Sequence, residues 1–147
     1  MRSKEPKKFF SPEESAQIVA AIEQAEKLTS GEIRVHLERK IKSDAFEEAK
    51  RVFEKLGMTK TAERNGILFF LSLKDKRFAL LGDRGIHEKV ASDFWKIIRD
   101  EVLQNFKEEK YVEGLVAGIA KCGAKLAEHF PYQANDQNEL SNEISCS

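Results

Sequence analysis

The sequence predicts an α/β fold in which a small mixed sheet is flanked by about four helices. Two observations predict it. A helical pattern over 44–57 lies between strand patterns at 32–39 and 66–73, the order of a parallel βαβ unit with a right-handed crossover. The second strand is followed by a short charged turn and a third strand at 77–82, which is typical of an antiparallel hairpin.

The first helix has a strong start signal in Ser11-Pro12-Glu13-Glu14. Ser11 is the expected N-cap, Pro12 takes the first helical position, and Glu14 completes a capping box. Thr29-Ser30-Gly31 ends this helix. The residues from Glu32 to Glu38 then alternate between polar and apolar, which predicts the first strand.

The second strand is apolar on both faces, as expected of a central strand covered by helices on both sides. After the hairpin we predict a long helix over about 86–105 and another over about 110–129, which Pro131 ends. The last residues are polar and rich in Asn, Gln, Ser and Glu. We therefore predict one folded domain over 9–131 and a disordered polar tail over 132–147.

Composition limits the function classes. The 147 residues include 25 basic and 25 acidic ones, so no global field attracts nucleic acid or an anionic membrane. No apolar run approaches the roughly 20 residues that span a bilayer, and we find no apolar signal core. The two cysteines lack metal-ligand spacing. We expect a cytoplasmic, soluble monomer without a membrane segment, in which Cys122 is a small buried group.

Several short segments form an ordered series along the chain. They are Ser30-Gly31-Glu32-Ile33-Arg34-Val35, Arg64-Asn65-Gly66-Ile67-Leu68, Asp75-Lys76-Arg77, Gly82-Asp83-Arg84-Gly85-Ile86, Phe94-Trp95, Gly114-Leu115 with Gly118-Ile119, and Phe130-Pro131. Together they resemble the TPM-domain family, named for a thylakoid lumen protein, a photosystem repair factor and a receptor modulator. The resemblance spans roughly 9–131.

This resemblance implies a three-layer α/β/α sandwich around the mixed sheet. It also implies a divalent-cation site that usually holds calcium, and an acid phosphatase activity proposed for plant members. Many relatives carry an export signal and a C-terminal membrane helix. We find neither pattern here, so we expect a small bacterial-like member without a membrane-bound role.

Polar side chains meet at one end of the predicted sheet. Glu32 begins the first strand, Asn65 precedes the second, and Asp83 follows the third. Two carboxylates held close together repel unless a proton or a cation intervenes. Oxygen donors without nearby cysteine favour a hard ion, Ca²⁺ or Mg²⁺, with main-chain carbonyls and water completing the shell. We predict a metal site with Glu32, Asp83 and Asn65 as ligands, the last chosen from its position alone.

Two other interpretations stay open. Asp83 would simply cap the following helix while Glu32 is a solvated strand residue. A phosphate would bind at the opposite sheet end, where the basic segment Arg39-Lys40-Ile41-Lys42-Ser43-Asp44 precedes a helix.

Enzyme motifs are sparse. No arginine follows Cys122, no Asp-x-Asp occurs, and no Walker A loop is present. A phosphatase would have to use a metal-activated water at the carboxylates, with His87 as an acid or base. We therefore predict a non-catalytic calcium-binding module that stabilises or recruits an unknown protein partner. The alternatives are a weak metal-dependent acid phosphatase and an interaction scaffold that binds no ion.

Overall fold

The computed structural model describes residues 2–133 and 139–147. The helices are α1 (Pro6–Phe9), α2 (Pro12–Glu26), α3 (Ala45–Lys55), α4 (Arg84–His87), α5 (Ser92–Lys107) and α6 (Tyr111–His129), with a 3-10 turn η1 (Met58–Lys60). The strands are β1 (Glu32–Glu38), β2 (Gly66–Ser72), β3 (Arg77–Gly82) and β4 (Ser145–Cys146).

The sheet has the order β3-β2-β1-β4. β1 and β2 run parallel, with Glu32 opposite Gly66, and β2 and β3 run antiparallel, with Ile67 opposite Gly82. This confirms the βαβ unit and the hairpin that the sequence predicts. Every residue of β2 is buried, because helices cover both faces of this central strand.

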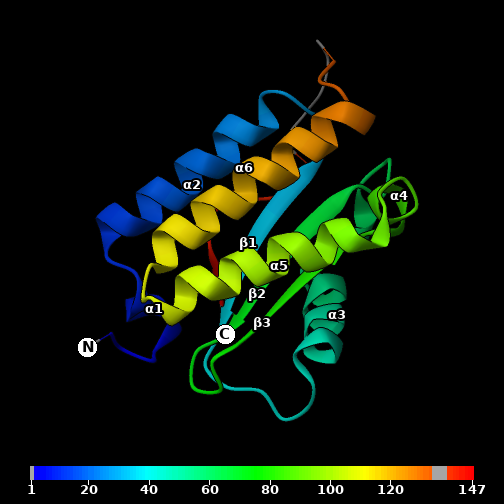
Figure 1. Cartoon of the computed structure of the whole chain (residues 1–147). Coiled ribbons are helices and arrows are strands. Elements are labelled where there is room, and N and C mark those ends of the chain that lie inside the picture. Colours follow the sequence, from blue (N-terminus) through cyan, green and yellow to red (C-terminus); the bar gives the residue numbers. More distant parts are fainter. Residues whose placement is uncertain (1, 134–138) are drawn as a thin grey trace.

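Helices form a layer on each side of the sheet, which confirms the three-layer α/β/α sandwich. α2, α6 and α5 lie side by side over one face, and α3 covers the other (Figure 1). Alternate residues of β1 and β2, such as Ile33 and Phe69, pack into the larger core under the three helices. Leu68 and Phe70 pack into the smaller core with Phe53 of α3.

The predicted capping box at the start of α2 is present. The Ser11 hydroxyl accepts a hydrogen bond from the Glu14 amide at 3.1 Å, and the Glu14 carboxylate accepts one from the Ser11 amide at 3.0 Å. Two of the amides that a helix start leaves without partners are thereby satisfied. Local sequence therefore sets this helix boundary.

The long helix predicted over 86–105 is two helices in the structure, α4 and α5, with a break over 88–91. Ile86 and Val102 are both buried in the larger core. In one continuous helix these residues would point about 160° apart, at roughly 100° per residue. The break allows both side chains to reach the same core.

The end of the chain also differs from the prediction of a disordered tail over 132–147. β4 pairs parallel with β1, and the Ser147 amide donates to the Leu37 carbonyl at 2.9 Å. His36 of β1 is buried, with its Nδ1 2.9 Å from the Ser145 hydroxyl. This edge of β1 offers unpaired backbone groups, and a short polar segment satisfies them. Residues 134–138 of the predicted tail lie outside the described residues.

α6, the longest helix with 19 residues, packs against both α2 and α5. A Cβ placed on Gly123 would lie 2.6 Å from the Cβ of Ala25 in α2, so the absent side chain permits the close helix contact. Within the described ranges, no helix combines the length and the hydropathy that a bilayer crossing requires.

Gly85 provides a test of the packing at the sheet end. A Cβ there would overlap the carbonyl oxygen of Glu63 and lie 2.5 Å from that of Arg64, two main-chain atoms that cannot rotate away. We expect Gly85→Ala to lower the unfolding free energy by about 1–3 kcal/mol, or roughly 3–10 °C in Tm. The matched control is Gly66→Ala, whose added methyl would lie 3.5 Å from its nearest neighbours. Equal thermal melts for the two variants would contradict the close contact.

Candidate functional site

The strand register brings the predicted ligand residues to one end of the sheet. Glu32 is opposite Gly66, and the Asp83 amide donates to the Gly66 carbonyl at 2.8 Å. Glu32, Gly66 and Asp83 thus form one row across three strands, with Asn65 one residue outside it. Because β2 runs between them, the backbones of Glu32 and Asp83 are about 10 Å apart, two strand spacings. We call this sheet end the rim.

Asp83 is held by its own partners. It is only 7% exposed, and its carboxylate oxygens accept hydrogen bonds from the Arg64 guanidinium at 2.7 and 2.9 Å. One oxygen also accepts the Arg84 amide at 2.8 Å and caps α4. The helix-capping interpretation of this residue is therefore confirmed. The bidentate arginine supplies the positive charge beside the buried Asp83 carboxylate.

Glu32 is buried, with 3% of its surface exposed, so it is not the solvated strand residue of the simpler interpretation. Its Oε1 accepts the Leu140 amide at 2.6 Å. The C-terminal segment therefore covers this carboxylate. Sequence reasoning treated that segment as a tail and did not place it here.

The side-chain oxygen of Asn65 is buried without a hydrogen-bond donor among the described residues. Its side chain is almost fully buried, at 1% exposure, and Nδ2 lies 3.5 Å from the Ser30 hydroxyl. Its Oδ1 accepts no hydrogen bond from any described residue. The Ser30 hydroxyl in turn donates to the Glu63 carboxylate at 3.1 Å. A buried acceptor without a donor calls for a water molecule or an ion.

Glu26 is the residue at this end that sequence reasoning missed. Its carboxylate accepts the Ile33 amide at 2.9 Å, next to Glu32. Its pKa is raised to about 8, mainly by burial, with a smaller contribution from the neighbouring charges of Glu32 and Glu23, while the hydrogen bond from Ile33 acts in the opposite direction. Glu26 follows Ile18 and Ile22 at intervals of four, so an acidic residue on an apolar helix stripe was the available signal.

The rim does not contain a dense acidic cluster. Across residues 2–133 and 139–147, no group of three or more His, Cys, Asp or Glu side chains is placed to hold a metal ion. A cation here would need amide and main-chain oxygens in addition to carboxylates. The Asn65 Oδ1 is such an amide oxygen, whereas both carboxylate oxygens of Asp83 are bound by Arg64.

The basic segment at the opposite sheet end has no free helix N-terminus for a phosphate. The Asp44 carboxylate accepts the amides of Phe46 and Glu47 at 3.0 and 3.2 Å. These are the amides that an anion would use. The side chain of Asp44 takes the place of the anion, and the phosphate interpretation is wrong for this helix start.

Cys122 and His87, two side chains with reactive groups, have defined surroundings in the fold. Burial raises the pKa of the Cys122 thiol far above neutral pH, so it carries no reactive thiolate. His87 stacks on Trp95 with ring centroids 6.2 Å apart. Its ring is therefore partnered by an aromatic side chain.

The family model described as TPM domain matches residues 4–125. The chain therefore belongs to the TPM-domain family, as the ordered segments indicated. Among solved structures, the NMR structure of BA42 protein from the psychrophilic bacterium Bizionia argentinensis is similar, with a TM-score of 0.90 and 43% identity. The match covers 99% of this chain and 100% of that one. No curated protein matches the chain.

The raised pKa of Glu26 predicts a pH dependence of stability. Because the folded protein holds this proton up to about pH 8 and the unfolded chain releases it near 4.5, the free energy of unfolding falls as the pH rises between these values. Glu26→Gln keeps the acceptor oxygen and removes the charge. We expect its Tm to exceed that of the wild type by about 3–6 °C more at pH 9 than at pH 5.

Thermal melts across pH 5–9 measure this difference. Glu13→Gln is the matched control, because Glu13 is exposed on the same helix. A parallel pH dependence in the wild type and in Glu26→Gln would show that Glu26 ionises normally.

Proposed function

We propose that this TPM domain is a non-catalytic module that binds a divalent cation, Ca²⁺ or Mg²⁺, at the rim. The proposed ligands are Glu32, Asn65 and Asp83. The single observation that carries the proposal is the buried Oδ1 of Asn65, which no described donor satisfies. An oxygen in this state gains most from a hard cation, and buried Glu32 supplies negative charge in the adjacent row.

Arg64 has a defined part in this proposal. It neutralises Asp83 through two hydrogen bonds, so it competes with a cation for the same carboxylate. A bound cation would supply the positive charge that Arg64 provides beside Asp83 in the ion-free protein. Removing the arginine should therefore strengthen binding if Asp83 is a ligand, and leave it unchanged if Asp83 only caps α4.

Binding would also stabilise the fold. The three proposed ligands belong to the starts of β1 and β2 and to the end of β3. An ion shared between them would join the ends of three neighbouring strands, of which β1 and β2 are connected only by a long crossover. For this reason we propose that the bound ion stabilises the fold. The stabilised domain would then recruit a protein partner.

The phosphatase alternative has weaker support. It rests on the family resemblance, and its chemistry would need a water activated by the same ion. The thiols of Cys122 and Cys146 both have raised pKa values because of burial, so neither offers a covalent route. One ion with few carboxylates is a weak activator of water.

A calcium melt tests the cation site. At 100 times Kd, a bound ion should stabilise the folded state by about 2.7 kcal/mol, or roughly 5–10 °C in Tm. We expect Glu32→Gln and Asn65→Ala to remove most of this shift, and Arg64→Gln to lower the apparent Kd. Glu113→Gln, at an exposed position in the first turn of α6, is the charge-matched control. Absence of any calcium or magnesium shift in the wild type would refute the site.

Hydrolysis of p-nitrophenyl phosphate separates the module from the enzyme. With Ca²⁺ or Mg²⁺ present, we expect the wild type and Glu32→Gln to release product at the same background rate. Turnover that needs the ion and disappears in Glu32→Gln would establish the phosphatase instead.

A further inference from the structure

The edge of β3 is open within the described part of the chain. β3 is the terminal strand of the sheet and pairs only with β2, whereas the opposite edge is closed by β4. An edge strand offers unpaired amides and carbonyls that can hold an additional strand.

The register of β2 and β3 shows which backbone groups of β3 face outward. The Asp83 amide donates to Gly66 across the β2–β3 pair, and hydrogen-bonded pairs alternate along an antiparallel ladder. Asp83, Leu81 and Ala79 therefore direct their backbone groups toward β2. Phe78 and Leu80 direct theirs toward the open edge. No described residue forms a backbone hydrogen bond with them on that side.

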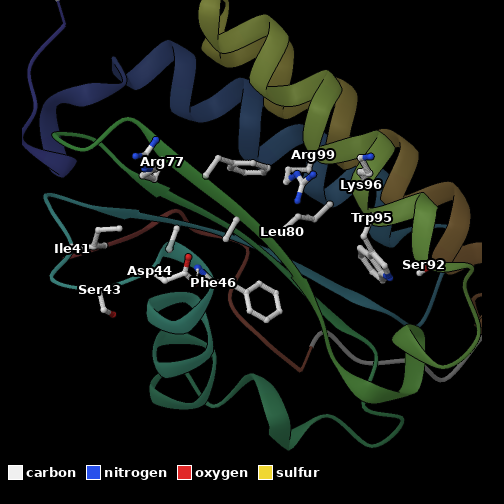
Figure 2. A pocket seen from close by; sticks show the side chains of 13 residues that line it. Ile41, Ser43, Asp44, Phe46, Arg77, Leu80, Ser92, Trp95, Lys96 and Arg99 are labelled. Atoms are coloured by element: carbon white, nitrogen blue, oxygen red, sulfur yellow. Dashed lines mark hydrogen bonds between the residues drawn. The ribbon is translucent and has the colours of Figure 1, made fainter.

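A groove of about 650 Å³ runs along this edge. Its floor is β3 from Arg77 to Leu80, and Figure 2 shows the first turn of α3 on one side and α5 on the other. This volume is within the range of sites that hold a drug-sized ligand or a short peptide. Trp95 packs so closely on Gly82 that a Cβ there would overlap its ring, and the indole closes one end.

The two walls of the groove differ in chemistry. The α3 wall is largely apolar and contains Ile41, Ala45 and Phe46. Phe46 is a large apolar side chain, yet it is 43% exposed. Its position in the first turn leaves the ring beside the sheet edge, where an apolar partner can cover it.

Basic residues dominate the other wall and the far end. Lys96 and Arg99 project from α5, and Arg77 stands at the start of β3 (Figure 2). Lys96 and Arg77 form no ion pair with any described residue, and Arg99 reaches only the exposed Asp100, at 3.3 Å. Asp44 is the one acidic lining residue, and its carboxylate caps α3. The groove therefore presents a positive field beside an open strand edge.

We propose that this groove binds an extended acidic segment of a partner protein, which adds to β3 as a further strand. Backbone hydrogen bonds to Phe78 and Leu80 hold the segment. Because side chains alternate along a strand, acidic residues face Lys96 and Arg99 while apolar residues face Ile41 and Phe46. The preferred sequence therefore alternates acidic and apolar residues.

The charges favour this occupant over a second copy of the chain. Two copies paired through β3 would bring both sets of Arg77, Lys96 and Arg99 together, and like charges repel. The chain as a whole carries no net charge, so the positive field is local to this groove. The site uses neither Glu32, Asn65 nor Asp83, so it adds to the proposed cation site and does not depend on it.

The test uses (Glu-Val)3-amide labelled with fluorescein at its N-terminal amine, titrated into the full chain at low salt with EDTA present. We expect saturable binding that weakens as ionic strength rises, and no binding of the (Gln-Val)3 analogue. Lys96→Glu and Arg99→Glu should each raise Kd at least five-fold. Lys107→Glu is the matched control, because Lys107 is exposed on the same helix outside the groove; its Kd should stay within two-fold.

Amide hydrogen exchange in the wild type reports the backbone contacts without any substitution. Saturating peptide should slow exchange at Phe78 and Leu80 at least ten-fold, and leave Ala79, already bonded to β2, unchanged. Absent saturable binding, or equal effects of Lys96→Glu and Lys107→Glu, would overturn the proposal. Unchanged exchange at both amides would overturn the added strand, because the peptide would then be held by charge attraction alone. Protection of those amides in a peptide-free dimer would assign the edge to a second copy instead.

Discussion

Burial of β2 on both faces is the constraint on which the rest of the structure depends. All seven residues from Gly66 to Ser72 are buried, so this strand must be covered by helices on each side and paired along both edges. Its parallel partner β1 and its antiparallel partner β3 then have fixed registers. The rim, the open edge of β3 and the edge of β1 closed by β4 all follow from that arrangement.

The same constraint explains how the rim accommodates polar groups. Glu32 and Asp83 are in one row, but β2 separates them, and each is satisfied by its own neighbour. Arg64 binds Asp83, and the Leu140 amide binds Glu32. Satisfying buried charges individually is far less costly than leaving them to repel. The buried Oδ1 of Asn65 is the exception, because no described residue donates a hydrogen bond to it.

The two edges of the sheet are treated differently. A short polar strand closes the edge of β1, with His36 and Ser145 in contact beneath it. The edge of β3 has no such cover among the described residues, and basic side chains lie on its α5 side and at its Arg77 end. Like charges at an edge discourage pairing between copies of the chain. The same charges would favour a pairing strand of opposite charge.

The sequence by itself determined the features that local chemistry controls. The capping box of Ser11 and Glu14, the central apolar strand and the charged hairpin turn each specify an element within a few residues, and the order of elements specifies the βαβ unit. Tertiary structure alone decided that helix 86–105 is broken, that the chain end forms β4, and that Arg64 is the partner of Asp83. These outcomes depend on which distant surfaces meet. A shared core for Ile86 and Val102, the pairing of β4 with the edge of β1, and a buried carboxylate have no signature in the residues adjacent to them. Only the assembled fold could reveal them.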